Sequence, residues 1–212
     1  MTKSETASLM TGAAALIGGA TQAAEALSVD ELIVKIKSAD DKVRGPAWQG
    51  AGPTGAPAVL PLAVVMSDPD FEIARSAKRA LYKIVRHAGR PGAESEAKAV
   101  ATELIPLLKS NAVPVRREAL WMLSEIGGDD AIAPMAALLN DKDVREDARC
   151  ALMRFTGSKA TAALKSAFVS APEDFKFALA ESLRKRGEKV DGYPTQKLKP
   201  TRQTTVTQPK TS

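Results

Sequence analysis

The 212-residue chain is poor in the side chains that carry most enzyme chemistry, because it holds one histidine and one cysteine. A lone Cys150 cannot form a disulfide within the chain, and together with His87 it cannot supply a tetrahedral zinc site or a Cys/His nucleophile pair. We expect Cys150 to be a buried, inert thiol and His87 to lie near the end of a helix. No metal or cofactor is therefore predicted.

Other motifs of catalysis and nucleotide binding are missing as well. The sequence has no Gly-rich phosphate loop, no serine nucleophile elbow and no recognisable pair of catalytic carboxylates. Acidic pairs such as Asp129-Asp130 stand at expected helix starts, where helix capping explains them. We predict that the protein is not an enzyme. Aromatic residues are only 4% of the chain and strand-type alternation is nearly absent, which favours closely packed helices rich in Ala and Leu.

What the chain does have is a repeated apolar pattern, in which an apolar residue is followed four positions later by Ala or Leu and eight positions later by a third apolar residue. The copies are Val43/Ala47/Ala51 (degenerate), Ile73/Ala77/Leu81, Val115/Ala119/Leu123, Val144/Ala148/Leu152 and Phe175/Leu179/Leu183, with starts separated by 30, 42, 29 and 31 residues. A unit of this length cannot bury its own apolar face and must stack on its neighbours. The pattern predicts an all-α solenoid of about five antiparallel helix pairs.

Each predicted pair consists of a helix A with an aliphatic run and a helix B with the repeated pattern. The predicted pairs are 29–37 with 41–50, 56–66 with 71–87, 96–108 with 113–126, 132–139 with 144–155, and 160–169 with 173–186. Pro46 falls inside the first helix B, which should be short or kinked. The turns inside three pairs contain Asp40-Asp41, Asp68-Pro69-Asp70 and Asn140-Asp141, which can cap helix B.

The turns between pairs contain Gly89-Arg90-Pro91-Gly92, Gly127-Gly128 and Gly157. Glycine can take the left-handed conformation that ends a helix, so we expect helix B to end at these positions.

The second, third and fourth units carry a resemblance to a known family. Three proline-containing runs resemble helix A of HEAT repeats: Val59-Leu60-Pro61-Leu62, Leu104-Ile105-Pro106-Leu107-Leu108 and Ile132-Ala133-Pro134-Met135. Val115-Arg116 or Val144-Arg145, the second after an acidic turn, then Ala119 or Ala148 and a closing Gly127 or Gly157, resemble helix B of the short bacterial HEAT class, which phycobilin lyases also contain. The resemblance covers about residues 28–187. It implies a right-handed, armadillo-like solenoid whose B helices line a concave face.

The two ends of the chain differ from this pattern. Residues 6–24 are uncharged and rich in Ala and Gly, and Ala24-Glu25-Ala26 fits a small-x-small cleavage site, so residues 1–27 are expected to be a signal peptide and the protein to be exported, periplasmic or secreted. The alternative is an N-terminal capping helix in a cytoplasmic protein. The stretch is too short and too rich in glycine to span a membrane. Residues 188–212 are Thr-, Lys-, Gln- and Pro-rich and are expected to be a flexible basic tail.

Most of the formal charge of +5 lies in that tail, where residues 189–212 carry +4. Residues 28–188 carry only +2, whereas a groove that grips nucleic acid needs a strongly basic surface. We therefore expect no specific nucleic-acid binding by the helical body. The tail leaves open a tether to an anionic surface or to nucleic acid.

The helical wheel of helix B separates a core arc from an outer arc. With Val115 at zero, Arg117, Trp121, Ser124 and Glu125 lie opposite the core arc. Trp, Tyr and Arg are frequent anchors of protein interfaces, so this outer arc is the candidate partner-binding ridge. Its candidate residues are Arg75, Arg79, Tyr82, Arg117, Trp121, Arg154, Phe177 and Arg184. The alternative is a solvated face with Trp121 packed against the adjacent unit.

A second row of side chains lies one residue after the start of the pattern. It contains Arg44, Arg116, Arg145 and Lys176, which share one wheel angle, and the second unit has Ala74 there instead. Asp residues in the preceding turns can pair with these cations, so a structural ion-pair ladder is expected rather than a ligand site.

These observations favour a non-catalytic scaffold or adaptor that binds an unknown protein partner on helix B. A phycobilin lyase-like role or another role as a HEAT-type accessory of an enzyme is the first alternative, although no residue marks a bilin pocket. HEAT arrays that hydroxylate a modified lysine bind iron through His-Glu pairs, and this chain has none. Binding of an anionic surface through the tail is the second alternative.

Overall fold

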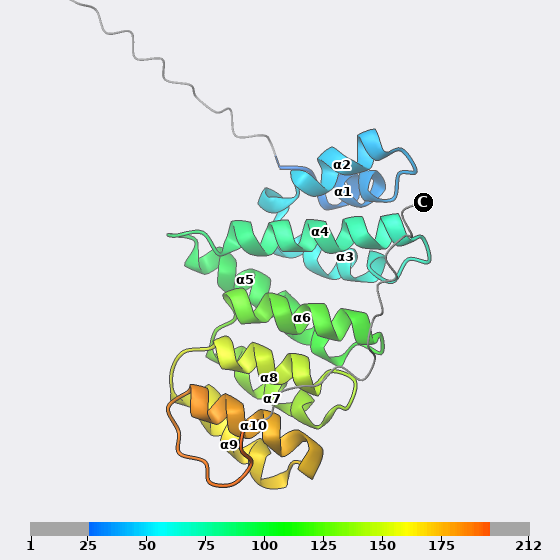
Figure 1. The fold of residues 1–212 in the computed structure, drawn as a ribbon. Helices are drawn as coiled ribbons and strands as arrows, with labels where there is room; N and C mark the ends of the chain where they lie inside the picture. Colours follow the sequence, from blue (N-terminus) through cyan, green and yellow to red (C-terminus); the bar gives the residue numbers. More distant parts are fainter. Residues whose placement is uncertain (1–25, 196–212) are drawn as a thin grey trace, which may run out of the picture.

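The computed structural model describes residues 26–195, which form ten α-helices and no strand. The helices pack as five consecutive antiparallel pairs, like HEAT and armadillo repeats (Figure 1). The all-α class expected from the pattern is confirmed. Residues 1–25 of the predicted signal peptide and the basic residues of the tail beyond residue 195 lie outside the described residues, so both assignments stay predictions.

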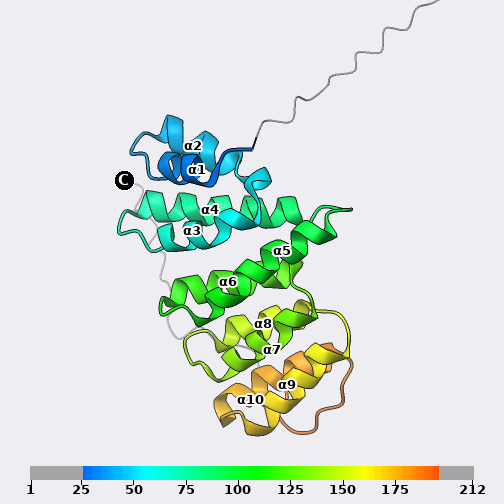
Figure 2. The ribbon, with the colours of Figure 1, turned by 180° about the vertical axis from the view of Figure 1, so that it is seen from behind.

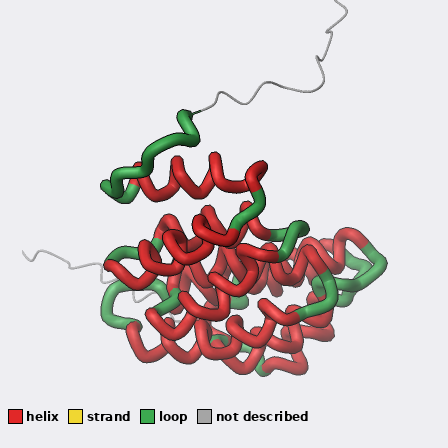
Figure 3. Tube along the Cα trace, turned by 90° about the horizontal axis from the view of Figure 1, so that it is seen from below, coloured by secondary structure: helices red, strands yellow, loops and turns green. Residues whose placement is uncertain are grey.

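The odd-numbered helices are the predicted A helices and the even-numbered ones are the B helices. The pairs are α1 (Val29–Ile36) with α2 (Asp41–Gln49), α3 (Val59–Val65) with α4 (Phe71–Ala88), α5 (Glu94–Leu104) with α6 (Val113–Ile126), α7 (Asp129–Ala137) with α8 (Arg145–Arg154), and α9 (Ser158–Ser170) with α10 (Glu173–Lys185). The two series form two layers, one facing the viewer in Figure 1 and the other in Figure 2, and loops join the helices at their ends in Figure 3. Each pair stacks on the next through contacts in both layers.

The repeated pattern forms the core between the layers. Its residues in the third, fourth and fifth units are all buried, including Leu123, Leu152 and Phe175. The two exceptions lie in the first two units, where Ile73 is half-buried and Val43 is 40% exposed. Arg44 is only 6% exposed, so the degenerate first copy turns its arginine inward and its valine outward.

Proline sets the limits of several helices. Pro46 lies inside α2, which has nine residues, as expected for a short helix. The predicted helix A 96–108 is divided, because α5 ends at Leu104 and a 3₁₀ turn, η3 (Ile105–Lys109), follows with Pro106 in its first turn. Pro106 has no N–H to continue the α-helical ladder.

Two of the three predicted Asp caps are confirmed. Asp40 accepts a hydrogen bond from the Lys42 N–H, and Asp70 accepts from the N–H groups of Glu72 and Ile73. Asp141 instead accepts from the Asp143 N–H inside the turn, and Val144 precedes α8 without a side-chain cap. The third turn therefore stabilises itself rather than helix α8.

The glycines between pairs act in two ways. Gly92 and Gly157 have positive φ angles of 80° and 87°, which glycine adopts readily. Neither ends a helix B as expected, because the residue that caps the end of α4 is Gly89, with a φ of −80°, and Gly157 directly precedes α9. Gly127 has a φ of −68°, so the expectation is wrong there. A Cβ at Gly127 would lie 2.5 Å from the Leu123 carbonyl oxygen and 3.1 Å from the Phe155 ring, so close packing requires this glycine.

The chain beyond α10 packs against the last pair over the part that the structure describes. Val190 lies against the core, and the Tyr193 ring meets Phe168 and Phe177 edge-on at centroid distances of 5.4 and 5.2 Å. Arg184 donates to the Tyr193 carbonyl at 2.8 Å. Residues 188–195, which the sequence assigned to the tail, thus cover apolar surface of the last pair, as a terminal cap does in repeat proteins.

Candidate functional site on the B helices

The arginine row lies at the ends of the B helices and links consecutive units. Arg116 donates to the Ser110 carbonyl at 2.7 Å and forms ion pairs with Asp141 at 3.2 Å and Asp143 at 3.8 Å. The preceding turn therefore supplies a carbonyl, whereas the carboxylates come from the following unit. This origin differs from the expected one, since the acids were expected in the preceding turns.

The other members of the row show three variants of this contact. Arg145 pairs with Asp174 of the following unit and lies over the Phe175 ring, 4.8 Å from its centroid. Arg44 donates to the Ser38 carbonyl and to Asp41. Lys176 pairs with Glu173 in its own helix. Only Arg116 and Arg145 thus connect neighbouring units by ion pairs.

A second set of contacts joins successive B helices on the candidate ridge. Glu118 of α6 accepts hydrogen bonds from Lys78 Nζ at 2.6 Å and from the Tyr82 hydroxyl at 2.9 Å, both on α4. Burial raises the pKa of Tyr82 well above its ordinary value, and the hydrogen bond to Glu118 raises it further. The Tyr82 hydroxyl therefore stays protonated and serves as a donor between the two helices.

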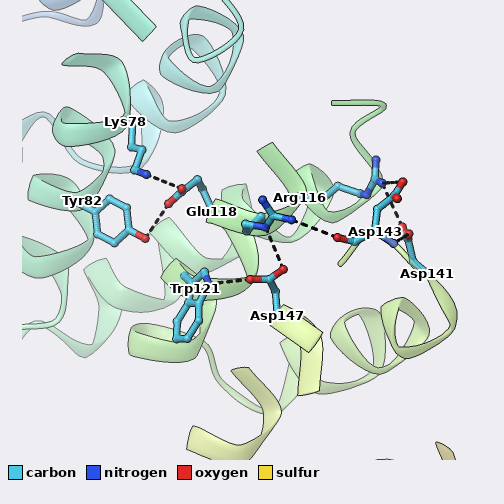
Figure 4. Close-up of polar contacts among 9 residues, drawn as sticks. Lys78, Tyr82, Arg116, Glu118, Trp121, Asp141, Asp143 and Asp147 are labelled. Atoms are coloured by element: carbon cyan, nitrogen blue, oxygen red, sulfur yellow. Dashed lines mark hydrogen bonds and ion pairs between the residues drawn. The ribbon is translucent and has the colours of Figure 1, made fainter. Parts of the chain in front are cut away.

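The same contact recurs one unit later. Asp147 of α8 accepts from Arg117 Nε at 3.0 Å and from Trp121 Nε1 at 3.2 Å (Figure 4). Trp121 is half-buried. Of the two alternatives, a partner-binding residue or a residue packed against the adjacent unit, the second describes the contacts that Trp121 makes. Arg154 completes this group, 6.0 Å from the centroid of the Trp121 ring.

Glu118 and Asp147 were not among the residues predicted from the sequence. Both lie three residues after the start of the pattern, at Val115 and Val144, so the repeat itself contains the signal. A recurrent acid at one wheel position, next to cations of the preceding copy, would have indicated a link between repeats.

A hollow on α4 collects the first group of predicted ridge residues. Arg79 lies over the Trp48 ring at 5.1 Å, and Arg86 lies over the Tyr82 ring at 5.7 Å. Together with Lys78 and Lys83 these side chains line a hollow of about 400 Å³. Trp48 of α2 was not among the predicted ridge residues, because the degenerate first unit gave no clear outer arc.

A second hollow of about 430 Å³ adjoins the first at the start of α4. It is lined by Met66, Phe71, Ala74, Arg75, Lys78, Arg79, Pro114 and Glu118. Phe71 is 71% exposed, and Arg75, one of the predicted ridge residues, lies 5.5 Å from its ring centroid. The two hollows share Lys78 and Arg79, so they form one continuous surface along α4.

The predicted ridge residues of the fifth unit lie in a different environment. Phe177 contacts the Tyr193 ring, and Arg184 donates to the carbonyls of Val190 and Tyr193. The structure therefore brings Arg75, Arg79 and Tyr82 together on α4 and Arg117, Trp121 and Arg154 together on α6 and α8. It places Phe177 and Arg184 against the chain's own C-terminal segment.

The single histidine and the single cysteine line neither of these two hollows. His87 stands in the last turn of α4, as expected, with Nε2 3.8 Å from a Glu96 carboxylate oxygen. Cys150 is half-buried rather than buried, beside the Arg149 guanidinium at 3.3 Å. Residues 26–195 contain no group of three His, Cys, Asp or Glu side chains that could hold a metal ion. Within that range no helix is long and apolar enough to cross a bilayer.

Comparison with known proteins identifies the repeat type in the second half of the chain. A family model described as HEAT repeats matches residues 101–184. No curated protein matches the chain. Among solved structures, an engineered protein is 22% identical over 73% of this chain and 77% of its own, with a TM-score of 0.39. A second engineered protein is 20% identical over 74% and 79%, with a TM-score of 0.41.

A designed armadillo repeat protein in complex with the peptide (KR)4 is 16% identical over 73% of this chain and 79% of its own, with a TM-score of 0.41. The family model supports the repeat assignment directly, since its range from residue 101 to 184 runs from α5 to α10. Residues 101–184 are therefore HEAT repeats, and the protein carries a HEAT repeat domain.

Proposed function

We propose that this protein is a non-catalytic scaffold that binds a partner protein on the face formed by its B helices. The observation that carries the proposal is the surface along α4, where aromatic and arginine side chains border two adjoining hollows. Arg, Trp and Tyr anchor many protein interfaces. Stacked helix pairs present such side chains on a rigid support, because each pair is held by its neighbours.

The arrangement of the charged groups supports the choice of this face. Arg117 and Trp121 are engaged by Asp147 in the inter-repeat contact, whereas Arg79 and Arg86 stack on aromatic rings. Arg79 and Arg86 can therefore bind a partner without the loss of an ion pair between repeats. A scaffold of this kind needs no catalytic group of its own.

Site-specific photo-cross-linking tests the proposal. A photoreactive residue at Lys83 on α4 should capture a partner in an extract of the source cells. The same residue at Lys98 on α5, which is exposed in the helix A layer, should not. The captured protein should then bind the purified chain with 1:1 stoichiometry. Equal capture from both positions, or a captured protein that fails to bind the purified chain, would contradict the proposal.

A further inference from the structure

Helix α4 carries a concentration of positive charge that the other B helices lack. It contains five cations, Arg75, Lys78, Arg79, Lys83 and Arg86, against one acid, Glu72. Like charges spaced four residues apart on a helix destabilise it. The chain therefore keeps on α4 a charge pattern that works against the stability of the helix.

Within residues 26–195, two of these cations have a carboxylate partner and three do not. Arg75 pairs with Glu72, and Lys78 pairs with Glu118. Arg79, Lys83 and Arg86 have no carboxylate partner among residues 26–195. These three residues follow one another at spacings of four and three, so they form one stripe on the helix surface. We call Arg79, Lys83 and Arg86 the basic stripe.

The aromatic rings beneath the basic stripe hold its cations in place. Arg79 and Lys83 lie 5.1 and 5.9 Å from the centroid of the Trp48 ring, and Arg86 lies 5.7 Å from that of Tyr82. Cations held over aromatic faces lose less conformational freedom when a ligand binds than free side chains do. The stripe is thus a partly preorganised anion-binding surface.

An apolar hollow continues the basic stripe toward the start of α4. Phe71 is 71% exposed there and lies beside Met66, Ala74 and Pro114. The axial rise from Phe71 to Arg86 is about 22 Å, which an extended peptide covers with about seven residues. The surface therefore fits a short segment with an apolar residue at one end and carboxylates along the rest.

We infer that the basic stripe and the Phe71 hollow bind an acidic peptide segment of the partner, with one apolar side chain in the hollow. This inference rests on the proposed function and names the chemistry of its partner. The carboxylates of the segment pair with Arg79, Lys83 and Arg86, and its apolar anchor packs on Phe71 and Pro114.

Two features favour an acidic peptide over a nucleic acid. A phosphate backbone needs an extended basic surface, because each neutralised phosphate contributes a small part of the affinity. The basic stripe contains only three cations, and the carboxylates of Glu72 and Glu118 border it. The exposed Phe71 ring is also suited to contact with an apolar side chain. A peptide supplies carboxylates and an apolar side chain in one short segment.

Fluorescence anisotropy with defined peptides tests the inference. The probes are fluorescein-labelled seven-residue peptides of alternating Asp and Glu with a Phe at the first or the last position. We expect saturable binding by at least one of them that weakens as salt is added. Replacing its Phe with serine should weaken binding severalfold, and a peptide of alternating Lys and Arg should not bind.

A matched pair of charge variants locates the binding. The stripe variant Arg79→Ser, Lys83→Ser, Arg86→Ser should bind the acidic peptide at least about tenfold more weakly. The control Lys98→Ser, Lys109→Ser, Lys142→Ser removes the same net charge from exposed lysines outside the B helices, and it should bind like the wild type. The reversal Arg79→Glu, Lys83→Glu should gain binding of the Lys/Arg peptide. Circular dichroism confirms that each variant is folded.

Several outcomes would overturn the inference. One is equal weakening of peptide binding by the stripe and control variants. Another is a peptide affinity that does not change when the Phe is replaced. A third is stripe-dependent binding of a single-stranded oligonucleotide or of anionic lipid vesicles that is tighter than binding of the peptides. Failure here is distinguishable from failure of the scaffold proposal. Cross-linking of a partner from a photoreactive residue at position 83 that survives the additional changes Arg79→Ser and Arg86→Ser would support the scaffold function and contradict binding of an acidic segment.

Discussion

The B helices present two kinds of surface, one on α4 and another on α6, α8 and α10. On the later helices every cation except Arg154 has a carboxylate partner within residues 26–195, as in Arg117 with Asp147 and Arg145 with Asp174. Arg154 lies over the Trp121 ring instead. On α4 three cations lack a carboxylate partner among the residues that the structure describes, and they stack on Trp48 and Tyr82. Similar residue types thus hold the array together in one region and offer a surface in the other.

This contrast coincides with a change in the spacing of the repeats. The start-to-start distance is 42 residues between the second and third units and 29 between the third and fourth. Helix α6 packs more extensively on α8 than on α4, and the Phe71 hollow lies between α4 and the start of α6. The Phe71 hollow thus lies at the junction with the longest spacing between starts.

The largest expected effect tests whether α4 and α6 also differ in how firmly their buried residues are packed. Leu81 of α4 and Leu123 of α6 are both fully buried at the last position of the pattern. Leu81→Ala and Leu123→Ala should each lower the free energy of unfolding by about 2–5 kcal/mol, because each leaves a cavity in the core. Urea denaturation followed by circular dichroism measures both. A Leu81 variant of nearly wild-type stability would show that the difference between the two regions extends into the core.

The core was the part that the sequence predicted best. The limits of α6, Val113 and Ile126, coincide with the predicted ones, because Pro114 and Gly127 mark the ends of a clear helical period. The pattern also placed Ala119 and Ala148 correctly in the core. Local periodicity and turn residues are enough for these features, since both act within one helix pair.

The contacts between units were harder to predict. The link from Glu118 to Tyr82 depends on how far apart successive B helices lie, which the period of a single helix does not determine. Tyr193 was missed as a capping residue because the composition of the tail is polar, yet one ring can cover Phe168 and Phe177. The significance of Trp48 was hidden by Pro46 and the degenerate first pattern.

The next largest effect compares Asp147, whose carboxylate joins two repeats, with Lys83, which has no carboxylate partner among residues 26–195. Asp147→Ala removes the acceptor of Arg117 and Trp121 and leaves the half-buried indole N–H without its partner. We expect a loss of about 1–3 kcal/mol in the free energy of unfolding. Lys83→Ala should leave stability unchanged within about 0.5 kcal/mol or raise it slightly, because Arg79 then loses a like-charged neighbour.

A double-mutant cycle sharpens this comparison. Trp121→Phe keeps an aromatic ring but removes the indole donor, so its cost should shrink in the Asp147→Ala background. Urea denaturation of the four proteins gives the coupling energy. Additive costs would show that the Trp121 to Asp147 hydrogen bond contributes nothing measurable, and a costly Lys83→Ala would place Lys83 among the structural charges.

The smallest expected effect concerns acid. The hydrogen bond from Arg145 lowers the pKa of Asp174 below its ordinary value. A carboxyl group whose pKa is lowered by folding stabilises the native state above its unfolded pKa, and this contribution is lost as the pH falls through the folded value. Between pH 7 and pH 3 the urea midpoint should therefore fall slightly less in Asp174→Asn than in the wild type. Asp191→Asn is the control, since Asp191 is exposed and has no ion-pair partner within residues 26–195. If Asp174→Asn and Asp191→Asn both show the pH dependence of the wild type, the Arg145 to Asp174 contact is too weakly formed in solution to link the fourth and fifth units.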